Sequence, residues 1–340
     1  MYKNIYVITP YALTTGGIEL CHQLVDYLRN KGQNAFIVYE LNGAISPNQD
    51  VTTAYKKYNI TTCSDIVDSE ENILILPETY FNFIHDYKHI KIGCWWMSVD
   101  NHFWWVCIRE LLHFKRRIGD KIKVLIKYFF FGQYRTSYSD KILLKERKRI
   151  FHFYQSRYAQ YYLYSKGYSN IMPLSDYINT ELSTPENLSQ LERENIVLYN
   201  PKKGWKFTKQ LISQMPNIRF VALEKLSREE LKTLMCQSKI YIDFGHFPGK
   251  DRLPREAVMN GCCVITGCNG ASFFYEDVPI LDDYKFSTKR TEIPNIKRKI
   301  EEIFCDFETH YKNFNHYRRI VSEEQQNFYN EIDNIFLKNE

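Results

Sequence analysis

The sequence predicts an α/β protein made of two Rossmann-like, doubly wound domains that face a cleft. Segments typical of buried strands alternate with segments typical of amphipathic helices along most of the chain. The 340 residues suit two domains of ordinary size, and 44% hydrophobic with 25% charged residues is typical of a soluble globular protein. We expect a first domain at residues 1–180, a linker at 181–195, a second domain at 196–318 and a C-terminal helix at 319–340.

The chain opens with a strand, a helix and a second strand, predicted at Asn4–Thr9, Gly16–Asn30 and Ala35–Tyr39. This order favours a parallel sheet. Gly16 and Gly17 lie at the turn into the helix, where the missing side chains let a phosphate approach the backbone. Both are candidate ligand contacts, although such pairs often only turn the chain.

Two further predicted strands, Ile73–Leu76 and Ile90–Trp95, each end in polar residues. Glu78 follows the first strand, and Asp100 and His102 follow the second. Ligands bind beyond the carboxyl ends of strands in such sheets, so we expect these three side chains on an exposed rim. They are candidate general bases, the alternative being a helix-capping Asp and a packed His.

Residues 104–150 stand apart in composition, with thirteen Lys or Arg against four Asp or Glu and a local charge of +9. Apolar residues recur there at helical spacing, namely Ile108, Leu111, Leu112, Ile118, Ile122, Leu125, Ile126 and Phe129. Basic residues occupy much of the rest of the helical wheel. This pattern predicts a helix that lies on an anionic membrane surface, the alternative being a helix with a core-facing stripe. Nucleic acid is not an expected partner, because no recognised motif accompanies the charge.

The first domain is predicted to end with another strand, helix and strand. The strands are Ile150–Tyr154 and Ile171–Leu174, and the helix is capped by Ser156 and ended by Gly167. The second domain is predicted to open with a strand at Ile196–Tyr199.

The loop after Ile196–Tyr199 contains two lysines. Lys202 and Lys203 precede a helix that reaches Gln214, and taken alone such a pair is typical of solvated surface charge. A strand at Ile218–Leu223 and a helix at residues 227–237 continue the alternation.

The most informative stretch is residues 239–267. It reads as a strand at Ile240–Phe244, a glycine-bearing turn, a helix with Pro254 in its first turn, and a second strand. Lys250 and Arg252 at the helix start suit a diphosphate, and the Glu256 carboxylate suits ribose hydroxyls. The plainer alternative is a surface loop with solvated charges.

Several of these residues resemble the signature of GT-B glycosyltransferases, especially the large retaining group of bacterial enzymes. The matching residues are Gly16-Gly17-Ile18-Glu19, Lys203-Gly204, Leu253-Pro254, Glu256-Ala257, Gly261 and Val264-Ile265-Thr266. The resemblance implies that Glu256 holds the nucleotide ribose, that Lys203 grips the donor diphosphate with Lys202 as its neighbour, and that the C-terminal helix crosses back to the first domain. One departure is that Pro248 stands where the family has its first Glu.

The resemblance implies a glycosyltransferase that uses a nucleotide sugar as substrate, needs no cofactor and acts on a glycan or lipid-linked acceptor in surface polysaccharide or lipopolysaccharide assembly. Alternatives are a catalytically silent GT-B subunit that binds membrane or a partner enzyme, and a nucleotide-sugar epimerase.

Nine cysteines, an odd number scattered through apolar runs, favour reduced thiols in a cytoplasmic protein, and the N-terminal residues lack the pattern of a signal peptide. No Cys or His spacing predicts a metal site. With no long apolar run either, we expect peripheral attachment at the inner face of the plasma membrane.

Overall fold

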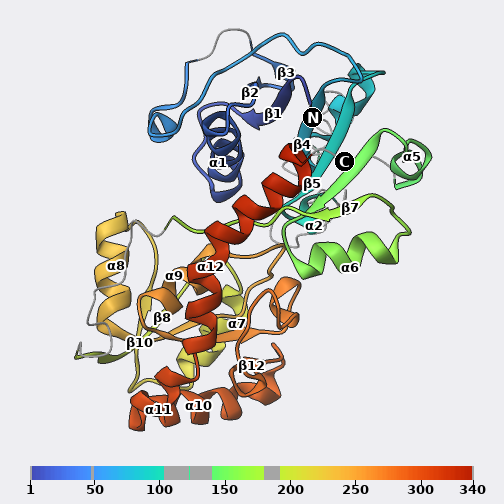
Figure 1. Ribbon diagram of the computed structural model, residues 1–340. Coiled ribbons are helices and arrows are strands. Elements are labelled where there is room, and N and C mark those ends of the chain that lie inside the picture. Colours follow the sequence, from blue (N-terminus) through green and yellow to red (C-terminus); the bar gives the residue numbers. More distant parts are fainter. Residues whose placement is uncertain (1, 47–49, 103–121, 123–139, 180–191, 339–340) are drawn as a thin grey trace. The chain divides into compact units, whose positions relative to one another are not determined.

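The computed structural model describes residues 2–46, 50–102, 122, 140–179 and 192–338. The chain divides into two compact units: the first is Met1–Asp176 with Gln326–Glu340, and the second is Tyr177–Gln325. Each unit is built on its own sheet (Figure 1). The predicted α/β class is therefore confirmed. Most of the basic segment 104–150 and of the predicted linker 181–195 lies outside the described residues.

The first unit contains a seven-stranded sheet in the order β3-β2-β1-β4-β5-β6-β7, parallel except for β3. Its strands are β1 (Ile5–Pro10), β2 (Ala35–Leu41), β3 (Ala44–Ile45), β4 (Ile73–Pro77), β5 (Lys91–Trp96), β6 (Ile150–Tyr154) and β7 (Ile171–Pro173). The helices are α1 (Gly16–Asn30), α2 (Val99–His102), α5 (Asp140–Lys145) and α6 (Arg157–Ser165). Helix α1 packs on β1 and β2.

The helix ends in this unit follow from short-range sequence signals. The Ser156 hydroxyl accepts a hydrogen bond from the Ala159 N–H at 3.1 Å and caps α6, as predicted. Helices α1 and α6 both stop at a glycine in the left-handed region, Gly32 with φ +80° and Gly167 with φ +75°. In each case the next residue donates back into the last turn, which satisfies a carbonyl that the helix leaves free.

The C-terminal segment completes the core of the first unit. The Phe328 ring stacks against Trp95 with centroids 6.4 Å apart, and the Tyr329 ring stacks on Tyr27 at 4.1 Å. The Tyr27 hydroxyl donates to the Asp333 carboxylate at 2.9 Å. Phe328 and Trp95 are fully buried, so their contact belongs to the core, whereas Tyr27 and Tyr329 are partly buried.

The second unit contains a five-stranded parallel sheet in the order β12-β11-β10-β8-β9. Its strands are β8 (Glu194–Tyr199), β9 (Arg219–Ala222), β10 (Ser238–Asp243), β11 (Cys263–Gly267) and β12 (Lys285–Phe286). The helices are α7 (Trp205–Ser213), α8 (Arg228–Gln237), α9 (Arg252–Met259), α10 (Ile293–Cys305) and α11 (Phe307–Lys312), and α12 (Asn315–Ile332) begins in this unit and ends in the first. Because β8, β10 and β11 are neighbours, the loops that follow them meet at one edge.

No helix within the described ranges is both long and apolar enough to cross a bilayer.

Candidate functional site

The loops after β8 and β10 approach each other with no room for a side chain between them. Gly204 ends the first loop in the left-handed region at φ +60°, and a Cβ atom there would lie 2.6 Å from the Phe244 carbonyl carbon. A Cβ atom on Gly245 would in turn lie 2.4 Å from Cβ of Lys203. Glycine is therefore required at both positions, and the contact fixes where the backbone of Lys203 lies.

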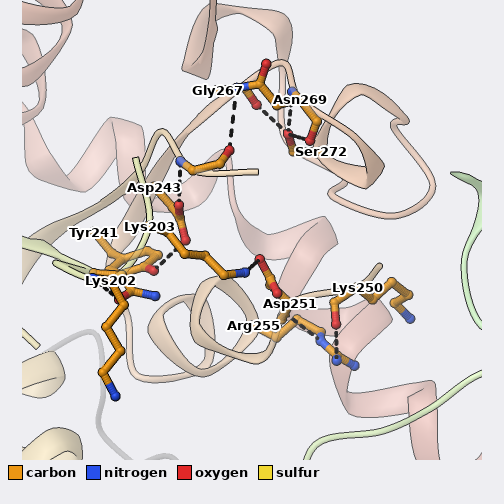
Figure 2. A network of polar contacts seen from close by, with 12 residues as sticks. Lys202, Lys203, Tyr241, Asp243, Lys250, Asp251, Arg255, Gly267, Asn269 and Ser272 are labelled. Carbon is orange, nitrogen blue, oxygen red and sulfur yellow. Dashed lines mark hydrogen bonds and ion pairs between the residues drawn. The ribbon is translucent and has the colours of Figure 1, made fainter. Parts of the chain in front are cut away.

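Lys203 forms the central ion pair of this edge. Its ammonium lies 2.5 Å from Oδ2 of Asp251, the residue immediately before α9 (Figure 2). The side chains of Lys203 and Asp251 are 30% and 21% exposed, so the ion pair is in contact with solvent. Lys202 is exposed, and its backbone N–H donates to Oδ1 of Asn200 at 3.0 Å. The ion pair with Asp251 therefore orients the Lys203 side chain at the carboxyl edge of the sheet, whereas Lys202 lies on the surface.

A buried carboxylate, Asp243, lies beneath the same turn at the end of β10. Its oxygens accept the Tyr241 hydroxyl at 3.0 Å and the Gly245 N–H at 2.9 Å (Figure 2). Burial raises the pKa of Asp243 to about 6, while nearby Lys203 opposes the rise. We did not predict a role for this residue, although an acid at the end of an apolar strand is a usable signal.

Arg252 and Glu256 face each other one turn apart on α9. The guanidinium lies 3.2 Å from Oε1 of Glu256, and the side chains are 25% and 10% exposed. Both predicted ligand residues are therefore at the carboxyl edge and close together. An opposite charge one turn away orients each group, and Arg252 keeps partial exposure whereas Glu256 is buried.

Lys250 lies in a different environment from the one that the sequence suggested. Its ammonium lies 2.9 Å from Oε1 of Glu324 in α12, and Arg255 binds the other carboxylate oxygen at 2.8 Å. Lys250 and Glu324 are 11% and 5% exposed, and Arg255 is 1% exposed. The expectation that Lys250 projects at the ligand edge is thus wrong, because a buried acid 74 residues further along the chain holds its charge.

Arg255 also shapes the loop that carries Asp251. Its guanidinium donates to the carbonyl of Asp251 at 3.2 Å and to that of Lys250 at 3.3 Å (Figure 2). Neither Arg255 nor Glu324 was predicted, since an arginine inside a helix is usually read as surface charge.

The loop after β11 is joined to the same edge. The Asn269 amide donates to the Gly245 carbonyl at 3.5 Å, and the Ser272 hydroxyl donates to the Gly267 carbonyl at 2.5 Å (Figure 2). Three loops thus meet at this edge, where the Lys203 ammonium is paired with the Asp251 carboxylate. Among the described residues, no group of three or more His, Cys, Asp and Glu side chains could hold a metal ion.

In the first unit, Gly16 and Gly17 begin α1 as predicted, and a Cβ atom on Gly17 would lie 3.3 Å from Sδ of Met97. This contact brings the start of α1 beside the end of β5. Asp100 is half-buried and accepts the Tyr158 hydroxyl at 3.1 Å.

Glu78 and His102 are both only 3% exposed, so the prediction that they lie on an open rim is wrong. The Glu78 carboxylate accepts the Met97 N–H at 3.1 Å and the Asn101 amide at 3.3 Å, and burial raises its pKa to about 7. The His102 ring packs edge-on against Trp96, with centroids 4.6 Å apart. The single turn of α2 folds His102 back onto the strand end, where aromatic side chains cover it.

Comparison with solved structures identifies the architecture. Across 98% of both chains, this chain is similar to sucrose-phosphate synthase from Thermosynechococcus elongatus, with a TM-score of 0.66 and 11% identity. It is also similar to Anabaena HepE in complex with UDP, with a TM-score of 0.58, 12% identity and 97% and 98% of the two chains covered. WaaG, a glycosyltransferase involved in lipopolysaccharide biosynthesis, gives a TM-score of 0.55 at 11% identity, over 98% of this chain and all of that one.

The chain therefore has the GT-B fold of these glycosyltransferase structures, as the sequence predicted. No known family profile and no curated protein sequence matches it.

Proposed function

We propose that this protein transfers a glycosyl group from a nucleotide-sugar donor to a glycan or lipid-linked acceptor in bacterial surface polysaccharide assembly. The observation that carries this proposal is the Lys203 ammonium at the carboxyl edge of a parallel sheet, with the Arg252–Glu256 pair on α9 at the same edge. In α/β sheets this edge is where nucleotides bind. Among proteins of similar fold, HepE was solved with UDP bound.

In the proposed reaction, Lys203 and Arg252 stabilise the negative charge that builds on the leaving diphosphate as the glycosidic bond to the donor breaks. The Glu256 carboxylate accepts hydrogen bonds from the ribose hydroxyls. Lys202, which is exposed nearby, adds positive potential that attracts the anionic donor. Positive side chains thereby supply the charge stabilisation for which other transferases use a divalent metal.

The acceptor side of the proposal rests on Asp100 in the first unit, because Glu78 and His102, the other two predicted residues, are both buried. Asp100 is the most accessible of these three. It is therefore our first candidate for the group that receives the proton of the attacking hydroxyl. Glu78 has a pKa suited to a general base, but its burial favours a role in holding the turn that carries Asp100.

Donor binding and turnover test the proposal together. The protein is titrated with UDP-, GDP- and ADP-sugars, and thermal stabilisation is measured; a ligand at 100 times its Kd adds about 2.7 kcal/mol. Release of nucleoside diphosphate with glycan and lipid acceptors is then followed. We expect one donor class to bind and to release its nucleotide, and Lys203→Ala to abolish both. Binding without release would favour a silent subunit, a changed sugar still joined to its nucleotide would favour an epimerase, and no binding would refute the proposal.

We also propose that the basic segment 104–150 docks the protein on an anionic membrane, where lipid-linked acceptors lie. The support is the sequence pattern, with its charge of +9. Replacing Arg116, Arg117, Lys121 and Lys123 by Glu should abolish sedimentation with anionic liposomes while nucleotide binding survives. High salt should weaken the sedimentation of the unmodified protein. An unmodified protein that never sediments with such vesicles at low salt would exclude this docking.

A further inference from the structure

An aromatic pair lies at the carboxyl end of β8, next to the lysine loop. Trp205 is the first residue of α7, and its ring stacks on that of Tyr199, the last residue of β8, with centroids 5.9 Å apart and 13° between the planes. Trp205 remains 44% exposed. One face of the pair is thus supported by the protein, while much of the indole meets solvent.

The supporting ring is fixed by the sheet. Tyr199 is registered with Ile242 of β10 on one side and Ala222 of β9 on the other. Its carbonyl also accepts the Leu223 N–H at 2.9 Å. The platform that Tyr199 offers to Trp205 is therefore rigid, and stacking on a rigid platform costs little conformational entropy when a ligand binds.

The core of the second unit does not need Trp205. Helix α7 buries Phe207, Thr208 and Leu211, and these residues form its core-facing side. A single exposed aromatic ring is ordinary on a protein surface. This one lies two residues from Lys203, beside Gly204, at the edge where a nucleotide is proposed to bind.

We infer that the indole of Trp205 stacks on the nucleobase of the donor, with Tyr199 as its backing; this inference rests on the proposed function. Lys203 would hold the diphosphate at one end of the nucleotide, and Trp205 would receive the base at the other. Every nucleobase has a π-face, so stacking of this kind tolerates base identity. The contact therefore supplies affinity for nucleoside diphosphates in general rather than discrimination between UDP and ADP.

The test compares UDP, ADP and inorganic pyrophosphate, which has no base, as ligands of the wild-type protein, Trp205→Ala and Trp205→Phe in calorimetric titrations. Trp205→Ala should weaken UDP and ADP binding about tenfold, equivalent to about 1.4 kcal/mol, and leave pyrophosphate binding unchanged. Trp205→Phe should recover most of the loss. The matched control is Tyr275→Ala, since Tyr275 is 48% exposed and stacks on His316 in the same unit, and it should bind UDP as the wild type does.

Equal UDP affinity in the wild type and Trp205→Ala would overturn the base contact and leave the proposed function standing. Equal losses for UDP and pyrophosphate would also overturn it, because Trp205 would then act by shaping the lysine loop. A wild-type protein that binds neither UDP nor ADP would overturn both the inference and the proposed function.

Discussion

Replacing Asp251 by Asn should increase the affinity of the protein for UDP. In the structure the Asp251 carboxylate lies 2.5 Å from the Lys203 ammonium, the group proposed to bind the diphosphate. A phosphate oxygen bound by the same ammonium would lie about 5 Å from the carboxylate, where two unit charges repel by about 3 kcal/mol at an effective dielectric constant of 20. The side chains are 21% and 30% exposed, so solvent screening reduces this to about 1 kcal/mol, or roughly fivefold in Kd.

Isothermal titration of UDP into the wild type and Asp251→Asn, at low and at high salt, measures this effect. The gain should shrink as salt rises, because the repulsion lies near the surface. Asp283→Asn is the matched control, since it removes the same charge from a side chain that is 80% exposed in the same unit. Unchanged or weaker UDP binding in Asp251→Asn, with a folded protein, would refute competition between Asp251 and the diphosphate.

Three further predictions concern buried or half-buried acids. Glu256→Ala should weaken UDP binding about tenfold by removing the ribose contact, whereas exposed Glu308→Ala should not. Glu324→Ala should lower the free energy of unfolding by about 3–5 kcal/mol in urea melts, because it removes the carboxylate that pairs with the buried Lys250 and Arg255 side chains. Replacing the exposed Glu323 by Ala should change the free energy of unfolding little. The folded pKa of Glu78, about 7, exceeds its ordinary value of 4.5. The folded state therefore binds the proton more tightly, and stability should fall by up to about 3 kcal/mol as pH rises from about 4.5 to about 7, a loss that Glu78→Gln should remove.

Each of these predictions has a contrary result. Wild-type UDP affinity in folded Glu256→Ala would remove that residue from the site. Equal urea midpoints for the Glu324 and Glu323 variants would show that the buried cations find other partners. A Glu78→Gln protein whose stability varies with pH as the wild type does would mean that Glu78 titrates normally.

The features that the sequence predicted correctly depend on neighbours within a few residues. Ser156 begins α6 and Gly32 ends α1 because capping and left-handed turns are local events. The strands β1, β4 and β6 are short apolar runs, recognisable without their partners. Their alternation with helices was enough to predict the α/β class.

The errors concern charges and rings whose partners are distant in sequence. Nothing near Lys250 indicates that Glu324 neutralises it, because the pair forms only when α12 packs beside α9. The burial of His102 likewise depends on Trp96 and Phe81 from two different elements. Sequence reasoning located the edge of the sheet on which charges gather, and tertiary packing decides which of those charges remain available to a ligand.

The contacts of the C-terminal segment have a consequence for the order of folding. The first unit includes Gln326–Glu340, which follows the whole second unit in the chain, and its Phe336 ring lies 6.2 Å from that of Tyr2. During synthesis from the N-terminus, the second unit has all of its residues before the first has its last segment. Until that segment is made, we expect Trp95 and Tyr27 in the first unit to lack the rings of Phe328 and Tyr329 that stack on them in the folded protein. The first unit, which is synthesised first, should therefore be the last to reach its native packing. A chain truncated after residue 325 should have a folded second unit and a first unit that lacks native packing.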